Sequence, residues 1–167
     1  MANHVQQLIE TLQQELQYQQ ELSTVLDNKL DAMRHYDLSR LEALTQNEHR
    51  LVDEIRQNEL RRTDAVRGAT RQFWPRRRQR PATCKELAQV SSEPEKSKLL
   101  TLAAMLAEVA EKVQRRNRIG TIASQKIMAH FDHIFQIIAQ SGRDIGLYSR
   151  GGKRSLLEQN RLVDALA

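Results

Sequence analysis

The sequence predicts an all-α protein: an antiparallel bundle of three long helices and one short helix, with coiled-coil-like packing and a flexible C-terminal tail. Apolar residues recur every three or four positions along most of the chain, which is the period of an amphipathic helix. Helix breakers are few, with 6 glycines and 3 prolines among 167 residues. The composition, 28% charged and 4% aromatic, is typical of long packed helices and disfavours a sandwich or barrel. We expect the bundle over residues 1–149, and a hinge with an amphipathic tail over residues 150–167.

The first helix is expected over about residues 3–35 and the second over about residues 38–67. The tight turn between them ends at Asp37, whose side chain can cap the second helix. The second helix is expected to fade near Gly68. The apolar positions of the first helix are Val5, Leu8, Ile9, Leu12, Leu16, Leu22, Val25, Leu26, Leu30 and Met33. Those of the second are Leu38, Leu41, Leu44, Leu51, Val52, Ile55 and Leu60.

A basic linker is expected over residues 68–82, the least helix-like part of the chain, which contains Pro75 and Pro81. No acidic residue lies between Asp64 and Glu86. The net charge of the whole chain is only +5, so its basic character resides in this stretch and not in the helices. The arginines of the stretch are Arg67, Arg71, Arg76, Arg77, Arg78 and Arg80.

Aromatic residues stand beside these arginines, and the combination permits two interpretations. Arg76, Arg77 and Arg78 could contact the phosphates of a nucleic acid or an anionic membrane surface. The neighbouring Phe73 and Trp74 could then stack on bases. In the other interpretation the segment is a solvated loop whose two aromatic rings pack back on the bundle, because one short basic cluster is a weak signal. A helical nucleic-acid-binding or RNA-associated protein is therefore the alternative function.

A short helix is expected over about residues 84–91 and a long one over about residues 93–142. Both begin with the spacing of a capping box, in Thr83–Glu86 and Ser92–Glu95, where each side chain can bond a free amide of the first turn. At about 1.5 Å per residue the long helix would reach about 70 Å, so its apolar stripe needs partners from the rest of the chain. The stripe comprises Leu99, Leu102, Leu106, Val109, Val113, Ile127, Phe131, Ile134 and Ile138.

The tail follows the paired glycines Gly151 and Gly152, which end regular structure. Its apolar residues fall at helical spacing. They are Leu156, Leu157, Val163 and Leu166. An amphipathic tail beyond a glycine hinge can pack on its own bundle or bind a partner, and the sequence permits both.

No catalytic residues, metal ligands or cofactor are expected, so the protein is not expected to be an enzyme. His130 and His133 lie one turn apart beside Asp132 and could hold a metal, but the lack of other ligands favours an exposed helix surface. The single Cys84 excludes an intramolecular disulfide and fits a reducing compartment. No apolar run approaches ~20 residues and no secretory signal is visible, so we expect a cytoplasmic protein without membrane insertion.

A series of motifs runs in order through most of the chain. Over residues 26–62, one helix is followed by an aspartate-containing turn, a Leu-x-x-Leu pair and a Glu-rich helix that closes in Glu-x-x-Arg. The matching positions are Lys29, Asp37, Leu41, Leu44, Glu48, Leu51, Glu59 and Arg62. Thr83–Ala88, Gln114–Ile119 and Leu147–Gly152 add three shorter elements. This order resembles the FlgN family of flagellar export chaperones, although the basic segment Arg71–Arg80 is not part of the family pattern.

The resemblance implies a cytoplasmic chaperone of the flagellar type III export system. Such a protein binds hook-associated proteins, which form the hook-filament junction, prevents their premature assembly and delivers them to the export gate. Tyr148 matches the tyrosine that docks on the gate protein FlhA, although it could also be an aromatic residue packed on the last helical turn. The client would bind the tail through its apolar residues, Leu156, Leu157, Val163 and Leu166. The resemblance favours protein partners over nucleic acid, and a homodimer stays open because a second copy could also cover an apolar seam.

Overall fold

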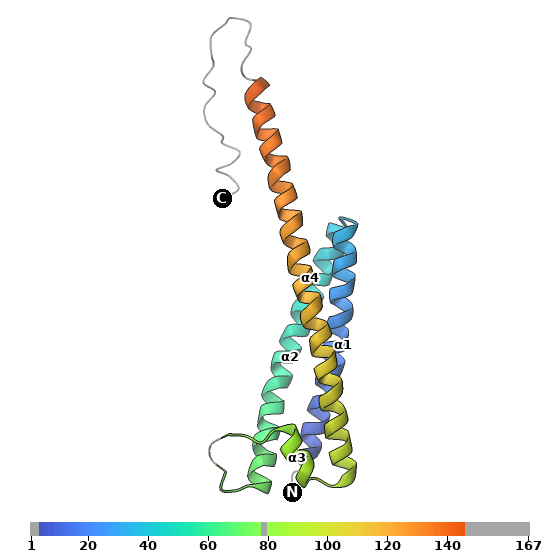
Figure 1. Ribbon diagram of the computed structural model, residues 1–167, viewed down its shortest axis with the longest axis vertical. Coiled ribbons are helices and arrows are strands. Elements are labelled where there is room, and N and C mark those ends of the chain that lie inside the picture. Colours follow the sequence, from blue (N-terminus) through green and yellow to red (C-terminus); the bar gives the residue numbers. More distant parts are fainter. Residues whose placement is uncertain (1–3, 78–79, 146–167) are drawn as a thin grey trace, which may run out of the picture. The chain divides into compact units, whose positions relative to one another are not determined.

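The computed structural model describes residues 4–77 and 80–145, and every regular element in these ranges is a helix (Figure 1). This confirms the predicted all-α class. The chain divides into two units, Met1–Ala123 and Ser124–Ala167, and the division falls inside the last helix. The predicted boundary between residues 149 and 150 lies outside the described residues. The helices are α1 (His4–Arg34), α2 (Leu38–Phe73), α3 (Cys84–Val90) and α4 (Glu93–Ile145).

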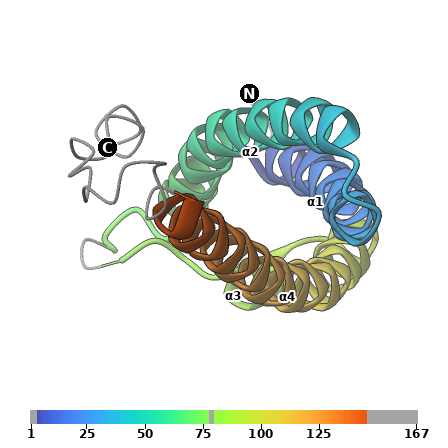
Figure 2. The same ribbon diagram turned by 90° about the horizontal axis from the view of Figure 1, so that it is seen from above.

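The helices α1 and α2 lie side by side and run in opposite directions, as Figure 1 and Figure 2 both show. The predicted turn joins them, and Tyr36 adopts a left-handed backbone there, with φ 53°. Asp37 caps α2 as predicted, because its Oδ1 accepts a hydrogen bond from the amide of Arg40 at 3.0 Å. Farther along the pair, the buried side chain of Asn58 donates from Nδ2 to the carbonyl of Thr11 at 2.9 Å and to Glu15 Oε2 at 3.0 Å.

The prediction that α2 ends near residue 67 is wrong, because the helix continues through Gly68 to Phe73. A side chain at position 68 would meet the first residue of α1, since a Cβ there would lie 2.5 Å from His4 Nδ1. The glycine therefore permits a close approach of two helices and does not break α2. The next two residues, Ala69 and Thr70, are buried, and this packing offsets the low helix propensity of glycine.

The linker is correspondingly shorter than the predicted residues 68–82, and its far end is tied to α2. Thr70 Oγ1 donates to the carbonyl of Val66 at 2.7 Å and accepts from the amide of Ala82 at 2.9 Å. The capping box predicted for α3 is complete. The Thr83 Oγ1 accepts from the amide of Glu86 at 3.2 Å, and Glu86 Oε2 accepts from the amide of Thr83 at 2.8 Å.

Two clusters of buried apolar side chains hold the unit Met1–Ala123 together. In one, Leu99 of α4 packs in a cluster with Val5 and Leu8 from the start of α1, and α2 and α3 also contribute. In the other, Val113 of α4 joins Leu22 of α1, farther along that helix. The first part of α4 therefore runs alongside α1 in the same direction.

The register of α4 against α1 explains where this unit ends. Arg116 of α4 forms an ion pair with Asp27 of α1. The last residue of α1, Arg34, lies seven residues after Asp27, and Ala123 lies seven residues after Arg116. Both helices rise by about 1.5 Å per residue, so α1 offers no further packing surface beyond the level of Ala123.

Within the described chain, no helix carries an apolar stretch of the length that crossing a bilayer requires.

Candidate interaction surface

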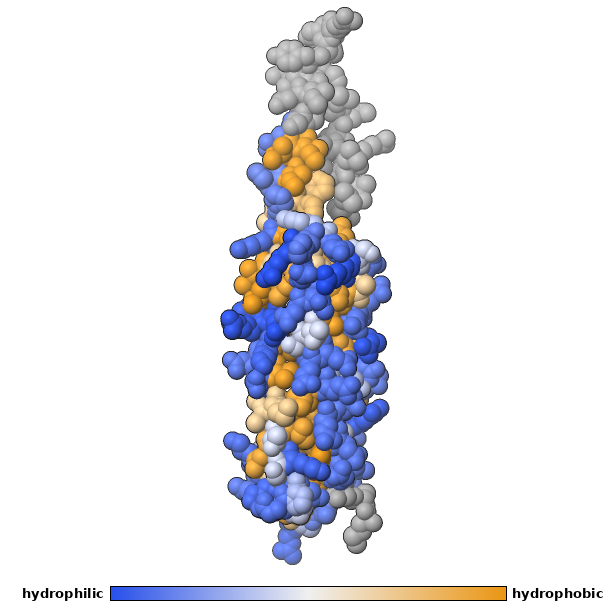
Figure 3. All heavy atoms as spheres, turned by 90° about the vertical axis from the view of Figure 1, so that its right-hand side faces the viewer, coloured by the Kyte–Doolittle hydropathy of each residue, from blue (hydrophilic) through white to orange (hydrophobic). Residues whose placement is uncertain are grey.

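The distal part of α4, residues 124–140, presents a row of large apolar side chains to solvent. Phe131 is 40% exposed, Phe135 61% and Ile138 60%. These residues continue the three- and four-residue spacing of the buried Leu99 and Leu102, so they extend one helical stripe. Figure 3 shows apolar side chains gathered on this part of α4. We call them the distal stripe: Ile127, Met128, Phe131, Ile134, Phe135, Ile137 and Ile138.

The distal stripe was visible in the sequence, but its exposure was not predicted. The sequence predicts that the rest of the chain covers the seam of the long helix. In the unit Met1–Ala123 the described helices cover that seam as far as Val113. A contiguous exposed apolar face of this kind is typical of a protein-interaction site.

The histidines of the distal part of α4 do not form a metal site with their neighbours. His130, Asp132 and His133 are all exposed. No group of three histidine, cysteine or acidic side chains that could hold a metal ion occurs among the described residues. These three side chains therefore lie on an exposed helix surface.

Two arginines of the basic linker pair with one carboxylate of α3. Arg77 and Arg80 both pair with Glu86, each with an N···O distance of 3.0 Å. These guanidinium groups, together with the amide of Thr83, lower the pKa of Glu86 from its ordinary value of 4.5 to about 2. The single negative charge of Glu86 thus offsets one of the two positive charges that it binds.

The aromatic residues of the linker region pack inward. Phe73 and Trp74 are half-buried against the first cluster and meet edge to face, with ring centroids 5.9 Å apart. The guanidinium of Arg77 lies 5.5 Å from the centroid of the Trp74 ring, which is a cation–π contact. This arrangement removes the aromatic platform on which the nucleic-acid alternative depended. Arg76 is exposed, and Arg78 lies outside the described residues.

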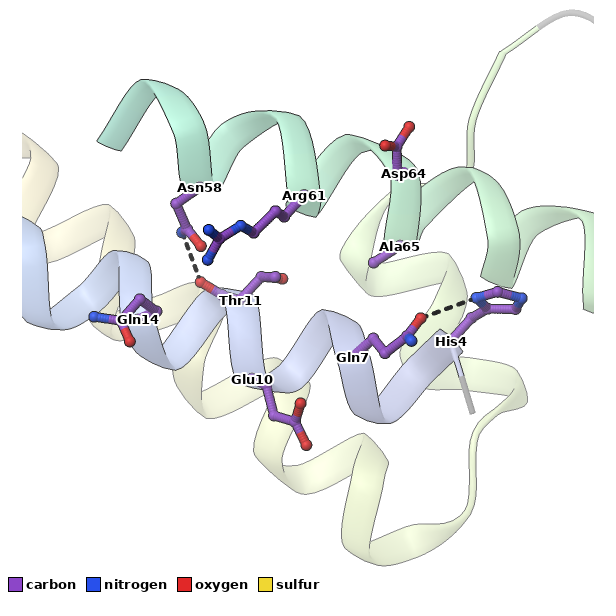
Figure 4. A pocket seen from close by; sticks show the side chains of 9 residues that line it. All are labelled: His4, Gln7, Glu10, Thr11, Gln14, Asn58, Arg61, Asp64 and Ala65. Carbon is purple, nitrogen blue, oxygen red and sulfur yellow. Dashed lines mark hydrogen bonds between the residues drawn. The ribbon is translucent and has the colours of Figure 1, made fainter. Parts of the chain in front are cut away.

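A polar groove of ≈ 530 Å³ lies between α1 and α2 (Figure 4). His4 and Gln7 line one end and are joined by a hydrogen bond of 3.1 Å between His4 Nδ1 and Gln7 Oε1. Arg61 extends from α2 over the groove, near the bond between Asn58 and the Thr11 carbonyl. The groove contains no nucleophile paired with a base. Cys84 lies elsewhere, and burial raises the pKa of its thiol, which disfavours the reactive thiolate.

The residues that carry the family resemblance make contacts that hold the fold. Lys29 of α1 forms an ion pair with Glu48 of α2, and Leu51 is fully buried. Arg62 donates two hydrogen bonds to Glu59, at 2.7 and 2.6 Å, and this pairing lowers the pKa of the Glu59 carboxyl. Lys29, Glu48 and Leu51 therefore contribute to the packing of α1 on α2, whereas the pair of Glu59 and Arg62 lies within α2.

The predicted contact residues of the C-terminal region lie outside the described residues. They are Tyr148 for the export gate and Leu156, Leu157, Val163 and Leu166 for the client. Their roles stay predictions.

An all-helical protein with an exposed apolar helix face belongs to the class of helical protein-interaction proteins. Its described surface is better suited to binding a helix of another protein than to binding a substrate. Comparison with known families gives the particular assignment: a family model described as FlgN protein matches residues 1–155. The chain therefore belongs to the FlgN family, a family of flagellar export chaperones, and the resemblance found in the sequence is confirmed. No curated protein and no solved structure matches the chain.

Proposed function

We propose that this protein is a cytoplasmic chaperone that binds hook-associated proteins, prevents their premature assembly and delivers them to the flagellar export gate. The observation that carries the proposal is the distal stripe of α4, because an exposed row of large apolar side chains is a surface for a partner helix. Family membership supports the flagellar setting.

The physical basis is the pairing of two apolar seams. The terminal helices of hook-associated proteins are expected to form coiled coils, so before assembly they carry an apolar seam of their own. The distal stripe runs from Ile127 to Ile138, about three helical turns, and fully burying one such side chain contributes about 1.5–3 kcal/mol. Part of that gain is offset by the ordering of both partners.

The remaining parts of the chain complete the proposal. Helices α1, α2 and the first part of α4 act as a three-helix bundle that holds the distal stripe on a stable support. The tail residues Leu156, Leu157, Val163 and Leu166 extend the apolar contact with the client. Tyr148 docks on FlhA after the client is bound.

The test is binding of hook-associated proteins from the same organism to the full-length chain, measured by pull-down and calorimetry. The variant Phe135→Ser with Ile138→Ser should lose at least about tenfold in affinity, because two anchors of the stripe become polar. The control is Leu38→Ser with Leu60→Ser, which changes two apolar residues of α2 that are 70% and 66% exposed. This control should bind as the unchanged protein does.

A third chain lacking residues 153–167 tests the tail separately. Equal binding by the truncated and full-length chains would show that the tail is not a client contact. Failure of every hook-associated protein to bind the full-length chain would overturn the proposal. Sedimentation of the free protein shows in parallel whether a second copy covers the stripe, since the stripe variant would then shift the protein from dimer to monomer.

A further inference from the structure

A second exposed face of α4, within the unit Met1–Ala123, combines positive charge with apolar side chains. Arg115, Arg118, Ile119 and Ile122 lie three or four residues apart, so they share one side of the helix. Ile119 is 42% exposed and Ile122 is 48% exposed. Both arginines are exposed as well. We call these four residues the basic face of α4.

The charges of the basic face are not neutralised within the described chain. Neighbouring Lys112 pairs with Glu108 at 2.5 Å, and Arg116 pairs with Asp27. Arg115 and Arg118 take part in no ion pair with any described residue. No acidic residue occurs from position 112 to position 123 of the sequence.

The buried side of the same helical turns is already occupied. Val113 is buried in the second cluster, so the packing of α4 on α1 and α2 requires nothing from the basic face. Ile119 and Ile122 are therefore exposed beside two guanidinium groups that have no carboxylate partner among the described residues.

We propose that the basic face binds an acidic amphipathic helix of the exported client, with carboxylates on Arg115 and Arg118 and apolar side chains on Ile119 and Ile122. This inference rests on the proposed function and specifies the chemistry of the client. Charge complementarity of this kind selects the partner and accelerates association. A protein segment fits better than nucleic acid, because the apolar members are aliphatic and offer no ring on which bases can stack.

The test uses two designed helical peptides of about 20 residues with the same leucine stripe, one with glutamate and one with lysine at the flanking polar positions. Both are titrated against the full-length protein by fluorescence anisotropy. The acidic peptide should bind at least about tenfold more tightly than the basic one at about 50 mM NaCl, and the difference should shrink at about 300 mM because exposed charges are screened.

Two charge-reversed proteins locate the effect. Arg115→Glu with Arg118→Glu should weaken binding of the acidic peptide about tenfold or more, because attraction becomes repulsion. The matched control, Arg71→Glu with Arg76→Glu, makes the same change in net charge at two exposed arginines of α2 and the linker, and should change binding less than about twofold. Circular dichroism confirms that both proteins remain helical.

The outcomes separate this inference from the proposed function. Equal losses of affinity in the two charge-reversed proteins, or equal affinity for the two peptides, would overturn the proposal that the basic face binds an acidic helix. Binding of a single-stranded RNA that depends on Arg115 and Arg118, without binding of the acidic peptide, would overturn it as well.

Two further outcomes distinguish the two proposals. If hook-associated proteins bind normally to the Arg115→Glu, Arg118→Glu chain, the role of the basic face is refuted and the proposed chaperone function stands. If no hook-associated protein binds but the acidic peptide does, the role of the basic face stands and the proposed identity of the client is refuted.

Discussion

The two parts of α4 carry the same apolar spacing but have different surroundings. In the first part, Leu99 is fully buried and Val113 nearly so, in clusters built with α1 and α2. In the distal part, residues at equivalent positions are exposed, as Phe131 and Ile138 illustrate. The difference shows that an apolar stripe indicates the need for a partner but not whether that partner belongs to the same chain.

The largest expected effect is on the free energy of unfolding when one apolar side chain is truncated in each part of α4. Leu99→Ala should lower the free energy of unfolding by about 2–5 kcal/mol, because it removes a fully buried side chain and leaves a cavity. Ile138→Ala should change it by less than about 0.5 kcal/mol, since its side chain is 60% exposed. Urea unfolding of both variants measures the difference. Similar losses would mean that the distal stripe is packed in the free protein.

A smaller effect is expected at two helical glycines whose surroundings differ, the crowded Gly68 of α2 and the open Gly120 of α4. Gly120→Ala should stabilise the protein by about 0.5–1 kcal/mol, because a Cβ there meets no atom within 4 Å and alanine favours the helix. Gly68→Ala should give no such gain, since its Cβ would press on His4. Thermal unfolding compares the two. Adding His4→Ala to Gly68→Ala should restore the gain, and a gain without it would show that the approach of α1 is looser than the structure indicates.

The smallest effect concerns the linker that leads to the first part of α4. Glu86 has its pKa lowered from 4.5 to about 2, so its charged pairs with Arg77 and Arg80 stabilise the folded state at neutral pH. Because the folded pKa lies below the unfolded one, this contribution is complete above about pH 4.5 and is lost as the pH falls towards 2.

The comparison of the unchanged protein with Glu86→Gln measures that contribution. The difference in melting temperature should be constant between pH 7 and pH 5 and should disappear near pH 2. A difference that persists at pH 2 would mean that the glutamine damages the capping box and not only the ion pairs.

Much of the fold could be predicted because its signals are local. The turn before Asp37, the capping box at Thr83 and Glu86 and the start of α4 each depend on residues within four positions of one another. The end of α2 could not be predicted in the same way. Gly68 weakens a helix by itself, and only the position of His4, at the far end of another helix, shows that the glycine permits close packing.

Less of the candidate site could be predicted from the sequence, because its features depend on residues that are distant along the chain. Glu86 stands nine positions after Arg77, so neutralisation of the basic linker depends on how the loop folds back. The burial of Val113 depends on the register of α4 against α1, two helices distant in sequence. The ion pair of Arg116 with Asp27 belongs to that register, and it joins residues 89 positions apart, which no local pattern predicts.

The division inside α4 also bears on how the length of the distal stripe can vary. The unit Met1–Ala123 ends within α4, and the distal stripe follows on the same continuous helix. Seven residues make nearly two helical turns, so insertion or loss of seven residues after Ala123 would lengthen or shorten the stripe and leave its direction almost unchanged. The length of the stripe can therefore vary in such steps without any change in the sequence of the unit Met1–Ala123.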